Sequence, residues 1–565
     1  MAYDVRLIVN ALRKCTGWFP GVHNASAYAP AVPLGGRPAV MEGVATNSLP
    51  LVTLSLSLKG ILFGLLVTFI VSYTRRSRQR LPPQPSRLPI VGNLFQLTDK
   101  RWLLSRDCKE RFGEVMYLDV LGKPTIIFNS LKSASEVLER RASNSPGRPR
   151  LIVVNEILFG GLGLAYMGHG EVWRRMRRAA HEALTKSAVQ RYHPIQTKEA
   201  TILVSALLAN PGNRERHIQR TAASAIMSIM YDYPTLVSGL DKVVQDMDRN
   251  IHWSARAAAG SSLVEFFPWM IHVPQRFAKW KRDALKQAAE RSQMFLRLFN
   301  HVKMDLVSVG VRPSFSASLI ERQDRNRLSE REMAFLAGSM FGAGLETTST
   351  SLTWWILAMV AFPETQRRAQ AELDAVVGRA RLPTYADAPR LPYVRAIIKE
   401  VLRWRPAVQL GVPHVAAEDD WYDGMLIPKG AICIANIWHC NHDRAVFGDD
   451  ADDFKPERHL GDNGELLPGP KETNLEGHVS FGFGRRVCVG RHLANDSLFI
   501  HTARILWATT LKCAQDENGK ELPPDTSAFE EMGIISRPPP FDCVIAPRFP
   551  EVQSILVEER ESFED

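Results

Sequence analysis

The sequence lacks the features that divide a long chain into separate units or cross-link it covalently. It has no internal repeat, no low-complexity tract, and no linker rich in proline, glycine and serine between about residues 100 and 540. Cysteine is scarce and odd in number, with seven residues scattered at positions 15, 108, 433, 440, 488, 513 and 543. This pattern argues against a disulfide framework and favours a reducing, cytosol-facing compartment. The 565 residues, 45% of them hydrophobic, predict one large globular domain.

No second cysteine lies at the C-x₂₋₄-C spacing from Cys488, which argues against a structural zinc site. Cys488 stands in the run SFGFGRRVCVG, residues 480–490. Glycines at positions 482, 484 and 490 let the backbone turn sharply and approach a flat ligand, where a Cβ would clash. A lone thiolate on such a loop suits one metal ion with an open opposite face, as in haem ligation. A buried free cysteine is the alternative interpretation.

This run resembles the haem-binding signature of the cytochromes P-450, F-x-x-G-x-R-x-C-x-G. It matches that signature at Phe481, Gly484, Arg486, Cys488 and Gly490. The resemblance covers about residues 80–550 and implies haem b as the cofactor, with Cys488 as axial ligand. It also implies a mainly α fold with a minor β part, in a single large domain of the cytochrome P-450 type. Arg486 would stabilise the thiolate and a haem carboxylate.

One long helix is predicted from a capping box formed by Ser329 and Glu332, and it runs without proline until Pro363. The helix is apolar nearly all round, so we expect it to be buried. Short apolar stretches at 115–128 and 412–434, interrupted by glycine and proline, predict strands.

The middle of this helix carries an acid and a hydroxyl in apolar surroundings, Glu346 and Thr347. Small residues at 342–344 leave room against the helix wall. The pair resembles the A-G-x-[DE]-T motif of the family, which implies that Glu346 delivers protons and Thr347 holds iron-bound dioxygen. The alternative is a local kink, with Thr347 bonded back to a carbonyl one turn earlier.

Glu400 and Arg403 are spaced to share one helix face and form an ion pair. Such pairs are common and usually solvated. The resemblance implies a different role, because the family joins this pair to the arginine of a P-E-R segment, here Arg458, in a buried triad behind the haem. The segment ends in His459, where the family more often has phenylalanine.

The two propionates of a haem need hydrogen-bond donors and cations. Trp173 and Arg177 lie one helical turn apart and resemble the W-x-x-x-R motif, whose indole and guanidinium would both point at one propionate. His414 occupies the position after E-x-x-R from which the family reaches the other propionate. For Trp173 the alternative is a core aromatic residue.

The chain also lacks a G-x-G-x-x-G dinucleotide fingerprint, because the run from Gly161 to Tyr166 has no third glycine. Electrons must therefore come from another protein, and the resemblance implies the membrane-bound NADPH–cytochrome P-450 reductase. The basic residues at 174–178 are expected to dock it. No nucleic-acid partner is expected.

The one candidate membrane segment is the run at 49–73, which holds a single charge, Lys59, and is long enough to span a bilayer. Arginines follow it directly, so the positive-inside rule places the rest of the chain in the cytosol. A cleaved signal peptide is disfavoured because the apolar run begins far from Met1. We therefore expect a single-pass protein of the endoplasmic reticulum membrane.

Residues 74–93 are basic and proline-rich, which predicts a stiff hinge like that of cytochromes P-450 of the endoplasmic reticulum. Residues 1–48 would lie in the lumen, where Asn24 is a glycosylation acceptor. Alternatively the N-terminal part of this extension is non-native, because Met41 could equally be the true start, and residues 1–40 would then not belong to the protein.

These features predict a haem-thiolate monooxygenase domain over 94–550, followed by a polar tail over 551–565. The expected reaction inserts one oxygen atom of O₂ into a lipophilic small molecule, such as a terpenoid or polyketide, as in fungal microsomal members that decorate secondary metabolites. Aliphatic residues dominate the segments expected to line the substrate pocket, namely 150–159, 341–344, 407–412 and 533–536.

Two other classes of protein remain open. One is a haem-thiolate isomerase, dehydratase or peroxygenase that works without a reductase. The other is a haem sensor or carrier without turnover, in which an acid–threonine pair would be superfluous.

Overall fold

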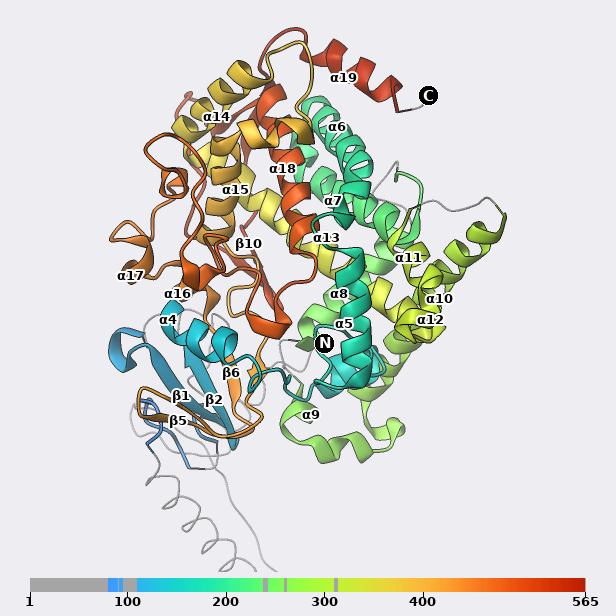
Figure 1. Ribbon diagram of the computed structural model, residues 1–565, viewed down its shortest axis with the longest axis vertical. Coiled ribbons are helices and arrows are strands. Elements are labelled where there is room, and N and C mark those ends of the chain that lie inside the picture. The colour runs from blue at the N-terminus through green and yellow to red at the C-terminus, as the bar shows by residue number, and fades with distance from the viewer. Residues whose placement is uncertain are drawn as a thin grey trace, which may run out of the picture.

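The computed structural model describes residues 80–89, 91–94, 109–236, 242–258, 262–308 and 313–563. In these residues the chain is mainly helical and carries four small sheets, as the sequence predicts (Figure 1). None of the helices in this part of the chain is long and apolar enough to cross a bilayer. The predicted membrane segment at 49–73 and the extension at 1–48 lie outside the described residues.

The longer helices form most of the domain (Figure 1). The helices of ten residues or more are α5 (Glu171–Ala183), α6 (His193–Ala209), α7 (Arg214–Tyr231), α8 (Lys242–Ala258), α10 (Lys279–Ser308), α13 (Glu330–Ala361), α14 (Pro363–Val376), α15 (Pro392–Trp404), α18 (Arg491–Ala508) and α19 (Val552–Glu561). The short ones are α4 (Leu131–Ala134), α9 (Leu263–Phe266), α11 (Phe315–Glu321), α12 (Gln323–Asn326), α16 (Ile437–Asn441) and α17 (Arg444–Phe447).

The largest sheet has the strand order β1-β2-β6-β3. Strands β1 and β2 pair antiparallel, β2 and β6 parallel, and β6 and β3 antiparallel. The other sheets are β4-β5, β11-β7-β8 and β10-β9. The bounds are β1 (Val115–Val120), β2 (Lys123–Phe128), β3 (His414–Val415), β4 (Asp420–Tyr422), β5 (Met425–Ile427), β6 (Ile432–Ala435), β7 (Thr509–Gln515), β8 (Glu521–Leu522), β9 (Glu530–Met532), β10 (Ile535–Arg537) and β11 (Cys543–Pro547).

Helix α13 runs through the middle of the domain (Figure 1). Its capping box is formed as predicted, since Glu332 N donates to Ser329 Oγ at 3.2 Å and Ser329 N donates to Glu332 Oε2 at 2.7 Å. The first half of the helix packs into one hydrophobic cluster with α7 and α10, and the second half packs into another with α15 and α18. The site residues of α13 lie between these two clusters.

The small residues of α13 do not all leave open space. A Cβ at Gly344 would lie 2.8 Å from Ile226 Cδ1, so this glycine lets α7 pack directly against the helix. Ile251 of α8 occupies the space beside Gly342. Ala343 between them is exposed to a cavity. The room that the sequence predicts at 342–344 is therefore narrower than expected.

Both ends of the described chain are fixed to the domain. Arg80 O accepts a hydrogen bond from Leu426 N at 2.7 Å, and Pro83 O accepts one from Tyr117 N at 3.0 Å, so the second half of the proline-rich segment lies along the sheets. The segment expected as a polar tail contains α19, whose Val552 and Leu556 are buried in the core.

Candidate active site

The Cys488 loop connects the short turn Gly484–Arg486 to α18. Cys488 N donates to Phe481 O at 2.8 Å, which closes the loop on itself. Gly484 has a φ of 55°, and a Cβ there would lie 2.4 Å from Leu138 O. The glycine is therefore needed for contact with the neighbouring π-helical turn, rather than for the approach of a flat ligand. Gly482 and Gly490, in contrast, line a cavity.

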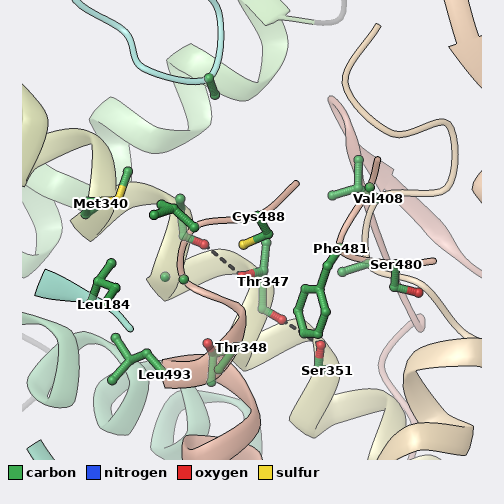
Figure 2. Close-up of a pocket in the computed structure, with 18 of the residues that line it drawn as sticks. Leu184, Met340, Thr347, Thr348, Ser351, Val408, Ser480, Phe481, Cys488 and Leu493 are labelled. Carbon is green, nitrogen blue, oxygen red and sulfur yellow. Dashed lines mark hydrogen bonds between the residues drawn. The ribbon is translucent and has the colours of Figure 1, made fainter. Parts of the chain in front are cut away.

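That cavity has a volume of about 310 Å³, and we call it the Cys488 cavity. Cys488 and Thr347 both line it, from the loop and from α13 (Figure 2). Cys488 is exposed to the cavity but surrounded by protein, so burial raises the pKa of its thiol. The backbone N–H of Gly490 and the cations Arg177 and Arg491 oppose this rise, because they favour the thiolate.

Thr347 adopts the back-bonded conformation that the sequence offers as an alternative. Its Oγ1 donates to Ala343 O at 2.8 Å, and Ser351 Oγ donates in turn to Thr347 O at 2.8 Å (Figure 2). Ser349 makes the same kind of bond to Leu345 O at 2.9 Å. Back-bonding therefore recurs along this part of α13, and Thr347 also faces the Cys488 cavity.

Glu346 does not line the Cys488 cavity. It lines an adjoining cavity of about 200 Å³ between α8, α10 and α13, which we call the α10 cavity. Ala343 and Thr347 line both cavities. The acid and the hydroxyl that the sequence pairs therefore share the α10 cavity, and Thr347 alone of the two also lines the Cys488 cavity.

Three arginines line the Cys488 cavity, and within the described part of the chain they donate hydrogen bonds only to carbonyl oxygens. Arg177 donates to Val487 O, and Arg486 donates to Pro146 O at 2.8 Å and to Met167 O at 3.0 Å. The third, Arg148, donates to Val412 O at 2.7 Å and was missed by the sequence analysis. Among the described residues none of the three has a carboxylate within ion-pair distance, and Arg486 Nη1 is buried without a partner.

The electrostatics of these arginines point to a missing anion. Burial, and next the charge of Arg486, lowers the pKa of Arg148 to about 9. Burial and Arg177 lower that of Arg486 to about 10. Several cations that repel one another in a buried space need compensation by negative charge.

The other two predicted haem contacts lie beside these arginines. Trp173 is buried, and the Arg486 guanidinium stacks 3.9 Å from the centroid of its indole. His414 Nδ1 donates to Ser145 O at 2.8 Å, and burial lowers the pKa of the ring to about 3. A neutral ring protonated on Nδ1 presents Nε2 as an acceptor, so His414 in this state is no donor for a carboxylate.

The predicted triad is present and has a fourth member. Arg403 donates to both oxygens of Glu400, at 2.7 and 2.8 Å, and both side chains are fully buried. Arg458 Nε donates to Glu400 Oε1 at 3.0 Å, and His459 Nε2 lies 2.9 Å from Glu400 Oε2. Burial raises the pKa of Glu400, but Arg403 and His459 outweigh it and hold the pKa well below its ordinary range. We call these four residues the Glu400 network.

The Glu400 network is linked to the Cys488 loop through Asn441. Arg403 Nη1 donates to Asn441 O at 2.7 Å. The side chain of Asn441 donates to Ser480 Oγ at 2.9 Å and accepts from Val479 N at 2.9 Å. Ser480 begins the loop that carries Cys488, so these hydrogen bonds attach the start of the loop to the Glu400 network.

The segments expected to line a substrate pocket do so in part. Phe159, Phe341, Val408 and Ile535 line the α10 cavity, one from each of the four predicted segments. Sequence reasoning missed α7, whose Ile226 and neighbouring apolar residues line the Cys488 cavity. No local sequence pattern distinguishes these residues, because an apolar helix face that lines a cavity looks the same in sequence as one that packs in the core.

The arginines at 174–178 do not form one exposed surface. Arg174 is exposed and pairs with Glu171, whereas Arg175 is partly buried against Glu332. Arg178 is exposed, and so is Arg485 on the Cys488 loop.

A single thiol that faces a cavity with uncompensated arginines on its walls fits a flat metal complex with two carboxylates, and so defines a haem-thiolate protein. Residues 82–543 match the cytochrome P450 family. A cytochrome P450 monooxygenase of Armillaria gallica is 50% identical over 492 residues, which cover 87% of this chain and 94% of that protein. Cytochrome P450 monooxygenase 58 of Postia placenta is 42% identical over 85% of this chain and 91% of its own length.

Among solved structures, a zebrafish cytochrome P450 with progesterone superimposes with a TM-score of 0.67 at 26% identity. The match covers 80% of this chain and 100% of that one. The chain therefore belongs to the cytochrome P450 family and is a cytochrome P450 monooxygenase.

Proposed function

We propose that the protein hydroxylates an apolar small molecule, a fungal secondary metabolite such as a terpenoid or polyketide, with electrons from NADPH delivered by a reductase. A substrate C–H bond becomes C–OH, the second atom of O₂ leaves as water, and NADPH supplies the electron pair. The observation that carries the proposal is that Cys488 and Thr347 line one cavity with predominantly apolar walls. The relatives named above are fungal monooxygenases.

In this proposal Cys488 would hold haem b, and Arg148, Arg177, Arg486 and Trp173 would bind the propionates. When bound, the haem supplies oxygen activation, which the thiolate ligand promotes. His414 contributes to the propionate site only if the added negative charge protonates its ring. Its hydrogen bond to Ser145 O fixes the ring orientation in either state.

The Thr347 hydroxyl lies at the wall of the Cys488 cavity and donates a hydrogen bond to Ala343 O. Rotation of this hydroxyl would direct the proton into the cavity. Glu346 lies on the other side of Thr347, in the α10 cavity, from which it can supply the next proton. The two residues together form a proton relay, in which Glu346 supplies the proton and Thr347 delivers it to the Cys488 cavity.

Electron delivery is proposed at exposed cations on the Cys488 loop and on α5. Arg485 is exposed three positions before the thiol, and Arg178 is exposed on α5. These cations suit the docking of an acidic flavoprotein. The run at 49–73 supports a location in the endoplasmic reticulum membrane, where such a reductase would be at hand.

The test is reductase-supported turnover by wild type and Thr347→Ala on an apolar natural product that shifts the haem spectrum. We expect Thr347→Ala to keep the haem and the red-shifted Soret band of the reduced carbon monoxide complex. It should divert most of the NADPH consumed to peroxide, because the proton donor at the cavity wall is lost.

Ser349→Ala is the matched control. Its hydroxyl makes the same back-bond but lines neither cavity, so coupling of NADPH to product should persist. Tight coupling in Thr347→Ala would contradict the relay. Turnover that needs no reductase would instead favour an isomerase or peroxygenase.

A further inference from the structure

Arg291 of α10 is a cation buried in an otherwise apolar part of the molecule. Its side chain is 1% exposed, and it lines the α10 cavity. Burial lowers its pKa to about 10, so it remains charged at neutral pH. A buried cation needs a partner of opposite charge or a full set of hydrogen bonds.

The partners of Arg291 are all neutral. Nη2 donates to Asn250 O and to Ser254 Oγ, each at 2.7 Å, and Nε donates to Asn250 Oδ1 at 3.3 Å. The guanidinium also lies 4.4 Å from the ring centroid of Phe159. Nη1 is buried and has no hydrogen-bond partner among the described residues.

Two other arginines provide a comparison. Arg403 and Arg504 are as deeply buried as Arg291. Each has a carboxylate, since Arg403 pairs with Glu400 at 2.7 Å and Arg504 pairs with Glu559 at 2.9 Å. Arg291 has no such partner in the described part of the chain. Glu346 is the other charged group that lines the α10 cavity.

The position of Arg291 is suited to a ligand that also reaches the haem side. The α10 cavity is otherwise lined mainly by apolar side chains such as Phe295 and Ile535. It meets the Cys488 cavity at Ala343, Thr347 and Val408, which line both. A molecule with its anion at Arg291 would extend its apolar body past Thr347 toward the reacting centre.

We infer that the substrate is an apolar carboxylic acid whose carboxylate pairs with Arg291. This inference rests on the proposed function and narrows it. The carboxylate compensates the buried charge of Arg291 and fixes which C–H bond lies beside Thr347. Neutral analogues of the same shape leave Arg291 without its anion and bind more weakly.

The experiment uses the haem-containing protein and a series of ω-imidazolyl alkanoic acids of increasing chain length, each with its methyl ester. The imidazole ligates the iron and reports binding as a shift of the Soret band, whatever the natural substrate is. At the best chain length we expect wild type to prefer the acid to its ester by about 10- to 100-fold, the value of a charge-assisted hydrogen bond.

Variants then assign this preference to Arg291. Arg291→Gln should bind acid and ester about equally, and Arg291→Lys should keep part of the preference because the positive charge remains. The matched control is Gln287→Ala, one turn earlier on α10 and part of neither cavity, which should keep the full preference.

Two results would overturn the inference and leave the proposed function standing. One is equal binding of acid and ester by wild type at every chain length. The other is a preference for the acid over the ester that survives in Arg291→Gln. Arg291 would then serve only to connect α10 to α8 through its hydrogen bonds. Failure of every imidazole to shift the spectrum, with no red-shifted carbon monoxide band, would overturn both proposals.

Discussion

Buried arginines on the two sides of the Cys488 cavity differ in whether they have a carboxylate partner. Behind the loop, Arg403 has its carboxylate, and its nitrogens donate further to the carbonyls of Asn441, Ala451 and Asp453. On the other side, Arg291 has three neutral contacts and a nitrogen without a partner. A buried arginine whose ion pair and hydrogen bonds are complete without a ligand, such as Arg403, serves to hold the Cys488 loop. A buried arginine without a carboxylate, such as Arg291, is suited to bind an anionic ligand.

The arginines inside the Cys488 cavity extend this comparison. Arg148 and Arg486 resemble Arg291, because they too bond only neutral groups and repel one another. In the proposed function, the propionates of the haem would supply negative charge to these two arginines. The same reasoning, applied to Arg291, assigns that charge to the substrate.

The largest effect on stability is expected when the Glu400 network is broken. Arg403→Gln leaves the fully buried Glu400 without its bidentate partner, and this should lower the free energy of unfolding by about 3–5 kcal/mol. Denaturant-induced unfolding of the haem-containing protein, followed by circular dichroism and by the Soret band, measures it. The matched control is Arg174→Gln, whose exposed pair with Glu171 should contribute less than about 1 kcal/mol. Equal losses for the two variants would contradict the comparison.

The parts of this network differ in how far the sequence predicts them. The pair of Glu400 and Arg403 follows from a local motif, and so does the capping box of α13, because a few neighbouring residues define each one. Arg458 lies 58 positions from Glu400, and only the resemblance to the family places it in the network. His459 could not be assigned, since its partner lies 59 positions away and histidine is a departure from the family's phenylalanine. Arg148 and Arg291 could not be found either, because an arginine becomes a site residue only through the helices and loops that bury it.

A smaller effect is expected from His459→Phe, which restores the residue more common in the family. It removes one bond to Glu400, whose oxygens still accept from Arg403, Arg458 and Lys455 N. The loss should be about 1–2 kcal/mol at neutral pH, partly offset by the apolar ring.

The pH dependence separates this histidine from a merely space-filling residue. Burial lowers the pKa of His459 in the folded protein, so the unfolded chain takes up a proton first as the pH falls below about 6.5. The stability that wild type gains from His459 is therefore present above that pH and is lost on acidification. The difference between wild type and His459→Phe should shrink as the pH falls, and a constant or growing difference would show that the histidine is protonated in the folded state.

The smallest effect is expected on the other side of the cavity, from Arg291→Gln in the absence of ligand. Glutamine keeps a donor for Asn250 O, and loss of the uncompensated charge removes a desolvation cost, so the free energy of unfolding should change by less than about 1 kcal/mol. The carboxylate-bearing imidazole, at 100 times its wild-type Kd, should stabilise wild type by about 2.7 kcal/mol and the variant much less. Thermal unfolding with acid and with ester measures both quantities in one series. A loss for Arg291→Gln as large as that for Arg403→Gln would mean that Arg291 supports the fold, and the contrast between the two sides of the cavity would be wrong.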